Sequence, residues 1–249
     1  MAAEIRTLLA KKPARPKQQS LLDMTSTQAR AFLLKPESYS RIELPTYFQF
    51  ATLLRRVAKT LEGQRLLDLQ QGSPRKHEGV NYAMLDNKDG RYAWRPLQLV
   101  HPALYISLVS QITNAANWKT IRKRLAEFAA IDNIKCLSIP ARSLSKQRDK
   151  AAQITQWWQG IEQGSIELAL DYQFLLLADI TDCYAAIYTH SIAWAIHDRD
   201  VAKTKRNDKS LIGNVIDDCM QDMRHGQTNG IPQGSVLLIF AFIIERSTV

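Results

Sequence analysis

Several common features are scarce in or missing from this 249-residue sequence. It has only three cysteines, Cys136, Cys183 and Cys219, and no Cys-x-x-Cys pair. Neither a zinc site nor a disulfide framework is indicated, and a reducing cytoplasm fits best. The N-terminus has no apolar stretch suited to a signal peptide. The longest apolar run, Val236 to Ile244, is much shorter than the roughly 20 residues that span a bilayer. We therefore expect a cytoplasmic protein with no membrane partner.

Acidic residues are also few relative to basic ones. The chain has 33 Lys and Arg against 24 Asp and Glu, a formal net charge of +9. Hydrophobic residues make up 45% of the chain, which is enough for a sizeable core. Surface Lys and Arg release counterions from phosphate backbones, so the balance favours a nucleic-acid partner. The basic stretches Lys11–Lys17 and Lys119–Arg124 are candidate phosphate contacts.

Hydrophobic periodicity and turn residues predict a mixture of helices and strands. A hairpin is expected where Asn81–Leu85 and Arg91–Arg95 flank a turn rich in Asn, Asp and Gly. A buried strand is expected over Phe174–Ile180. Helices are expected within 27–61, over 118–130, 144–162, 187–196 and 211–223, a strand over 134–139, and a buried helix or strand over 236–244. The fold class that follows is α+β.

One candidate site follows the predicted buried strand. The apolar run Phe174–Ala178 leads into Asp179-Ile180-Thr181-Asp182-Cys183-Tyr184. Magnesium prefers carboxylate oxygens held on a rigid element, and Asp179 at the end of such a strand could supply one. Taken alone, Asp179 is explained equally well as a strand-terminal residue that caps the next turn. The pair Asp217-Asp218 lies in a helical pattern and is interpreted as solvated or capping.

A second candidate site is the segment Gly230-Ile231-Pro232-Gln233-Gly234. Two glycines and a proline form a backbone that a nucleotide can approach closely. The amide of Gln233 offers both a donor and an acceptor. By itself, the segment could form any turn.

In this order, the two segments resemble motifs A and B of the reverse transcriptase palm. The hairpin Lys88–Arg95 resembles the retroviral fingers loop. Trp94–Gln98, His101-Pro102, Trp157-Trp158 and Tyr188–Ser191 resemble segments of prokaryotic defence-associated and abortive-infection reverse transcriptases. The resemblance runs from about Asn81 to Gly234. It implies a right-hand polymerase: a helical N-terminal region with a basic arm over 1–79, fingers over 80–164 and a partial palm over 165–249.

The resemblance also implies roles for individual residues. Asp179 would be the catalytic ligand of both Mg²⁺ ions, joined by the backbone of Ile180, and Asp182 would lie beside the triphosphate pocket. Tyr184 would stack under the sugar and reject a 2′-hydroxyl. Binding of the dNTP and template is implied for Lys88, Arg95 and, in reserve, Arg91 on the hairpin, and for Gln233 and Gly234 in the second motif.

The implied function is RNA-directed DNA polymerisation in antiphage defence, with an associated noncoding RNA as template, dNTPs as substrates and DNA as product. The third palm motif, Tyr-x-Asp-Asp, has no match before Val249. We therefore expect the 249-residue chain to be inactive alone, and a longer parent to be the active enzyme. The alternatives are a retron- or intron-type reverse transcriptase, and a non-catalytic RNA-binding scaffold on a polymerase fold.

Overall fold

The computed structural model describes residues 18–246, except 65, 70, 88, 89, 132–134, 146 and 147. These residues form two compact units, and each contains segments that are distant in the sequence. The first unit contains the described parts of residues 18–24 and 133–181, and the second those of residues 25–132 and 182–246. The described chain is a mixed α+β structure, as the sequence predicts.

The first unit is built around one short strand pair and one long helix. Its elements are β1 (Gln18–Ser20), η1 (Leu21–Asp23), β4 (Ala141–Ser143) and α8 (Asp149–Leu168). Strands β1 and β4 are antiparallel, with Gln18 opposite Ser143. The buried Asp149 at the start of α8 accepts a hydrogen bond from the Ser143 N–H at 2.7 Å. This bond ties the helix to the strand pair, because an unpaired buried carboxylate would be costly.

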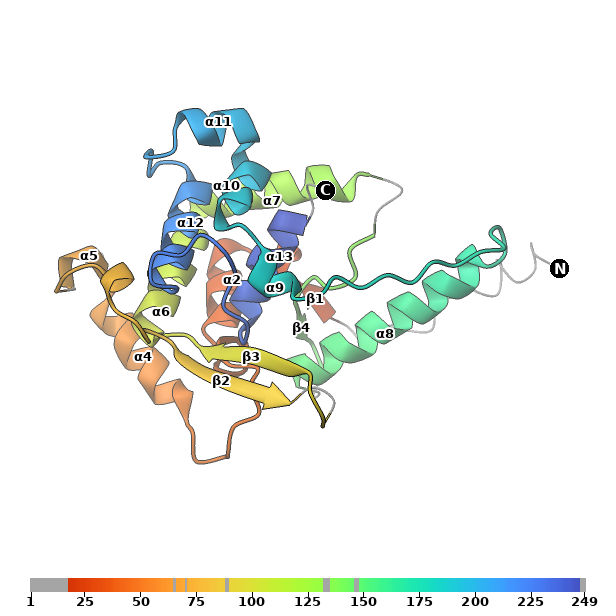
Figure 1. Cartoon of the computed structure of the whole chain (residues 1–249), viewed down its shortest axis with the longest axis horizontal. Helices are drawn as coiled ribbons and strands as arrows, with labels where there is room; N and C mark the ends of the chain where they lie inside the picture. The colour runs from red at the N-terminus through yellow and green to blue at the C-terminus, as the bar shows by residue number, and fades with distance from the viewer. Residues whose placement is uncertain are drawn as a thin grey trace. The chain divides into compact units, whose positions relative to one another are not determined.

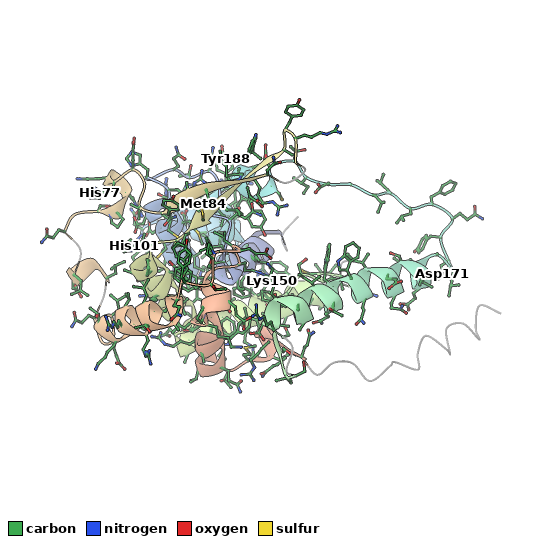
Figure 2. All side chains as sticks on the ribbon, turned by 90° about the horizontal axis from the view of Figure 1, so that it is seen from below. His77, Met84, His101, Lys150, Asp171 and Tyr188 are labelled. Atoms are coloured by element: carbon green, nitrogen blue, oxygen red, sulfur yellow. The ribbon has the colours of Figure 1, made fainter. Side chains whose placement is uncertain are left out.

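The strand predicted over Phe174–Ile180 is not formed, and this prediction was wrong. Residues 174–180 have no regular secondary structure, and the side chain of Phe174 is 92% exposed. In Figure 2, the chain that follows the labelled Asp171 is drawn without a helix or a strand. A strand needs backbone partners on a neighbouring strand. The described strands pair only as β1–β4 and β2–β3, so the apolar run has no partner among them. The strand expected over 134–139 is likewise absent from its described residues, and β4 begins only at Ala141.

The second unit is a group of helices with one hairpin at its edge (Figure 1). Its hairpin strands are β2 (Tyr82–Asn87) and β3 (Trp94–Leu99), and its 3₁₀ turn is η2 (Pro74–Lys76). Its helices are α2 (Ser26–Leu33), α3 (Pro36–Tyr39), α4 (Phe50–Thr60), α5 (Leu66–Leu69), α6 (Pro102–Ile112), α7 (Ala115–Ala129), α9 (Cys183–Ala186), α10 (Thr189–His197), α11 (Arg199–Thr204), α12 (Ile212–Asp222) and α13 (Val236–Arg246). The predicted helices over 118–130, 187–196 and 211–223 are thereby confirmed to within a few residues.

The core of the second unit lies around α6. Most of its side chains are buried, including the fully buried Tyr105, whose hydroxyl donates to the Leu33 carbonyl at 2.7 Å. The apolar run expected to form a buried helix or strand is helix α13, and its residues from Val236 to Leu238 are buried. In the described part of the chain, no helix combines the length and apolarity needed to cross a membrane.

The predicted hairpin is confirmed. Strands β2 and β3 are antiparallel with Tyr82 opposite Leu99 and Asp86 opposite Arg95. At the turn, the Gly90 N–H donates to the Asn87 side-chain oxygen at 2.8 Å, and Gly90 has a φ of +76°. Asn and Gly are the residues that tolerate such a turn. The hairpin therefore fixes Arg95 on a strand that leads directly to α6.

Candidate nucleotide-binding site

The two predicted metal-binding residues lie in the first unit and are exposed. Asp179 accepts a hydrogen bond from the Ile180 N–H at 2.9 Å. Contrary to the prediction, Asp179 does not end a buried strand, because residues 174–180 are irregular.

The residues after Asp179 form a tight turn in the second unit. Asp182 has a φ of 49°, in the left-handed region that Asp tolerates better than most residues. Its carbonyl accepts hydrogen bonds from the N–H groups of Ala185 and Ala186, both at 2.9 Å, which starts α9. The side chain of Asp182 is exposed, and that of Tyr184 is half-buried. The turn thus sets the position of Tyr184 two residues later.

Backbone hydrogen bonds join the second motif to this turn. The Ile231 N–H donates to the Tyr184 carbonyl at 2.8 Å, and the Gly230 N–H donates to the Ile187 carbonyl at 2.7 Å. Tyr188 and Asn229 form an isolated antiparallel bridge. The end of the first segment, from Asp182 onward, and the second segment therefore lie side by side in the second unit.

The other end of the second motif is joined to the hairpin. The Gln98 N–H, on β3, donates to the Gln233 carbonyl at 2.7 Å, and the Arg41 N–H donates to the Gly234 carbonyl at 2.8 Å. A Cβ atom on Gly234 would lie 2.6 Å from the Gln98 carbonyl oxygen. Only glycine fits there, because real Cβ atoms do not approach an oxygen so closely. The glycine that ends the second motif is thus needed for its contact with the hairpin.

The charges of two arginines influence the pKa of Tyr184. Burial raises the pKa of Tyr184, and Cys183 raises it further, while the charges of Arg41 and Arg95 act to lower it. Burial also lowers the pKa of Arg41, against the opposing influence of Tyr184 and Glu37. Arg95 comes from β3 and Arg41 from the segment after α3, and both are half-buried. A half-buried aromatic ring in the electrostatic field of two guanidinium groups offers groups suited to a sugar and its phosphates.

The structure thus brings together Tyr184, Arg95, Gln233 and Gly234 among the predicted site residues. Arg91 is exposed near the hairpin turn, and Lys88 lies outside the described residues. Sequence reasoning missed Arg41. An isolated arginine in a connecting segment carries no motif, and only the contact between its backbone and Gly234 shows that it belongs to the site.

Magnesium does not fit the predicted ligands by themselves. Asp179 and Ile180 offer one carboxylate and one backbone carbonyl, whereas Mg²⁺ takes near-octahedral oxygen coordination. In the portion of the chain that is described, no group of three or more His, Cys, Asp or Glu residues could hold a metal ion. The pair at 217–218 does not supply the missing acids, because each is engaged elsewhere.

Asp217 and Asp218 form hydrogen bonds and ion pairs that stabilise the fold. Asp217 is buried rather than solvated, and it bonds to the His190 Nδ1 at 2.6 Å and to the Gln221 amide at 2.9 Å. Asp218 forms an ion pair with Arg75 at 2.8 Å and another with Lys209. Both carboxylates thereby hold α12 against its neighbours.

Comparison of the sequence with protein-family models and with curated proteins found no significant match to either.

Proposed function

We propose that the chain is the fingers and part of the palm of an RNA-directed DNA polymerase that acts in antiphage defence, copying an associated noncoding RNA into DNA. One observation carries the proposal. Tyr184, Arg95 and Gln233-Gly234 come from separate segments of the sequence, and backbone hydrogen bonds assemble those segments in one unit.

Each group has a chemical task in the proposed site. The ring of Tyr184 packs against C2′ of the incoming nucleotide, where a 2′-hydroxyl would collide with it. The guanidinium groups of Arg95 and Arg41 bind the triphosphate, because their planar forks match pairs of phosphate oxygens. The carbonyls of Gln233 and Gly234 each accept a backbone hydrogen bond, from β3 and from the segment after α3. In the proposed site, this fixed backbone packs against the nucleotide and template.

Magnesium belongs to the proposal as the cofactor of phosphoryl transfer, where such ions stabilise charge on the attacking and leaving oxygens. Asp179 is the proposed catalytic carboxylate, with the carbonyl of Ile180 beside it. Further carboxylates must complete the set, because one acid cannot hold two ions. A cytoplasmic location is also part of the proposal, because the chain has only three cysteines and no Cys-x-x-Cys pair.

The second candidate function is a non-catalytic RNA-binding scaffold on a polymerase fold. The observation that favours it is that Asp179 belongs to no group of three or more His, Cys, Asp or Glu residues in the described chain that could hold a metal ion. A retron- or intron-type enzyme shares the chemistry of the first proposal and differs in the RNA that it copies.

Primer extension on an RNA template tests the proposal. The 249-residue chain and any longer product of the same gene are each supplied with Mg²⁺ and dNTPs. We expect synthesis from the longer product and none from its Asp179→Ala variant, since Asp179 is the proposed catalytic ligand. The exposed Asp171→Ala variant is the matched control and should retain synthesis. Undiminished synthesis by Asp179→Ala would overturn the assignment, and absence of synthesis from every form would favour the scaffold.

A further inference from the structure

Two aromatic rings stand exposed in the segment that precedes α4. The Phe48 N–H donates to the Pro45 carbonyl at 3.0 Å, which closes a turn. This turn presents Tyr47 at 75% exposure and Phe48 at 47%. Their ring centroids are 4.8 Å apart. Adjacent exposed aromatic rings are a feature of binding surfaces, because burying them against a partner releases a large apolar area.

A chain of aromatic contacts connects this pair to the core. Phe48 stacks on Phe50 with centroids 6.4 Å apart, and Phe50 meets the edge of the buried Tyr39 at 5.2 Å. The Tyr39 hydroxyl donates to the Val100 carbonyl at 2.5 Å. The exposed rings are therefore held in place before any partner arrives, and little conformational entropy is lost on binding.

The helix that follows adds positive charge on its outer side. Arg55, Arg56 and Lys59 on α4 are all exposed, whereas Leu54 is buried. At 3.6 residues per turn, the three basic residues lie on the side of α4 away from Leu54. Residues 44–61 contain no Asp or Glu, so nothing within this segment offsets the charge.

We propose that Tyr47, Phe48 and the outer side of α4 bind single-stranded nucleic acid. Unpaired bases stack on the two rings, while Arg55, Arg56 and Lys59 contact the phosphates. Aromatic rings beside a basic track are the general device for holding a single strand without reading its sequence. A protein partner would need an acidic surface to match the same basic residues. Such a partner would not explain the two adjacent ring faces, which suit the stacking of unpaired bases.

This surface follows a residue of the candidate nucleotide site in the sequence. Arg41, whose N–H donates to the Gly234 carbonyl, lies in the same connecting segment as Tyr47. A strand on the aromatic pair therefore starts within the unit that contains Tyr184 and Arg95. The identification of this strand as the template rests on the proposed function. The binding of single-stranded nucleic acid at this surface does not depend on the proposed function.

Fluorescence anisotropy with a fluorescein-labelled oligouridylate tests the surface. Stacking contributes about 1–3 kcal/mol per base, so Tyr47→Ala with Phe48→Ala should weaken binding at least about ten-fold. The salt dependence should stay the same, because no charge is lost. Arg55→Ser with Arg56→Ser should instead reduce the salt slope by about 0.7 per lost phosphate contact.

Matched controls separate this surface from others. Tyr82→Ala removes an equally exposed ring on β2, and Lys76→Ser removes an exposed charge on η2; both should bind as the wild type does. If the double alanine variant unfolds by circular dichroism, Tyr47→Leu with Phe48→Leu keeps apolar side chains and removes the stacking faces. The assay contains neither primer nor dNTP, so it reports this surface alone, and its outcome is distinct from that of the primer-extension test of the proposed function.

Two results would overturn the inference. One is wild-type affinity in the variants that lack both rings. The other is a protein contact at this surface: light scattering would show an assembly of chains that the ring variants dissociate, while oligouridylate affinity stays constant.

Discussion

At the scale of single residues, Tyr184 is the side chain on which the proposed chemistry depends most. Its side chain is half-buried, and its carbonyl accepts a hydrogen bond from the second motif. The charges of two arginines act to lower the pKa of its hydroxyl. A buried phenol needs polar neighbours, and here those neighbours are also the groups that would bind phosphate. Under the proposed function, this ring is the steric barrier to a 2′-hydroxyl.

Replacing Tyr184 with alanine should relax sugar selection. The smaller side chain leaves room for a 2′-hydroxyl, so the preference for a dNTP over the matching rNTP should fall by at least about ten-fold, a loss of roughly 1.4 kcal/mol of discrimination. The comparison is made with an active form in single-nucleotide incorporation. Tyr188→Ala is the control, since Tyr188 is an exposed tyrosine close by in the sequence. If Tyr184→Ala keeps the wild-type preference for dNTP over rNTP, the ring of Tyr184 serves only in packing.

The sequence predicted the motif residues of the second unit but not their surroundings. Gln233 and Gly234 could be singled out because glycine, proline and glutamine at fixed spacing form a local pattern. Arg41 could not, because its role depends on a backbone contact with a residue far along the chain. Asp217 was misread as solvated, since burial by His190 and Gln221 is decided by packing between helices.

At the scale of elements, close packing between α10 and α12 shapes the second unit. A Cβ atom on Gly213 would lie 2.7 Å from the Ala193 Cα. The Gly213 N–H also donates to the His197 Nε2 at 3.0 Å. A backbone N–H in the first turn of α12 therefore has a hydrogen-bond acceptor at the end of α10. Gly213 thus allows an approach of the two helices that a larger residue would prevent.

Gly213→Ala should destabilise the fold. The added methyl group has no space, and overpacking of this kind costs about 1–3 kcal/mol. Urea unfolding measures the loss. Gly164→Ala in α8 is the matched control, because a Cβ atom there meets nothing within 4 Å and helix propensity favours alanine by up to about 1 kcal/mol. Equal stability of Gly213→Ala and the wild type would contradict the packing.

The bond between His197 and Gly213 should make stability depend on pH. Burial lowers the pKa of His197, and its Nε2 accepts a hydrogen bond only when it is unprotonated. The folded pKa lies below the unfolded value near 6.5, so the folded state binds fewer protons. The stabilisation is therefore complete above that value and is lost as pH falls through the folded pKa.

Urea midpoints measured between neutral and mildly acidic pH check this expectation. The wild type should lose more stability on acidification than His197→Gln, whose side chain cannot titrate. Exposed His77→Gln is the control and should follow the wild type. Parallel pH profiles for wild type and His197→Gln would show that this bond does not sense protons.

Elements with strong local signals could be predicted, whereas those that need distant partners could not. Helices α7, α10 and α12 follow from hydrophobic periodicity, and the hairpin follows from its turn residues. The run Phe174–Ile180 has the apolar composition of a buried strand, yet no described strand pairs with it. Composition can indicate that a segment is suited to a sheet, but a sheet forms only where another strand supplies hydrogen bonds.

At the scale of the whole molecule, the second unit contains what the proposed function requires for nucleotide binding. It includes the hairpin, the turn at Tyr184 and the second motif. The first unit contributes Asp179 and a long helix with exposed Trp157 and Trp158, whose rings meet edge to face at 5.0 Å. Under the proposed function, nucleotide binding involves residues of the second unit and Asp179 belongs to the first, so nucleotide binding can be tested separately.

The most direct test of the central claim is binding of the next nucleotide to the chain on an RNA template with a chain-terminated DNA primer. Electrophoretic retention of labelled primer reports the complex without requiring catalysis. We predict that the complementary dNTP stabilises it and that a mismatched dNTP does not. Arg95→Ala should abolish the stabilisation, because it removes a phosphate-binding fork, while Lys76→Ser retains it. No stabilisation by the complementary dNTP, or full stabilisation in Arg95→Ala, would contradict the claim that these three segments form a nucleotide site.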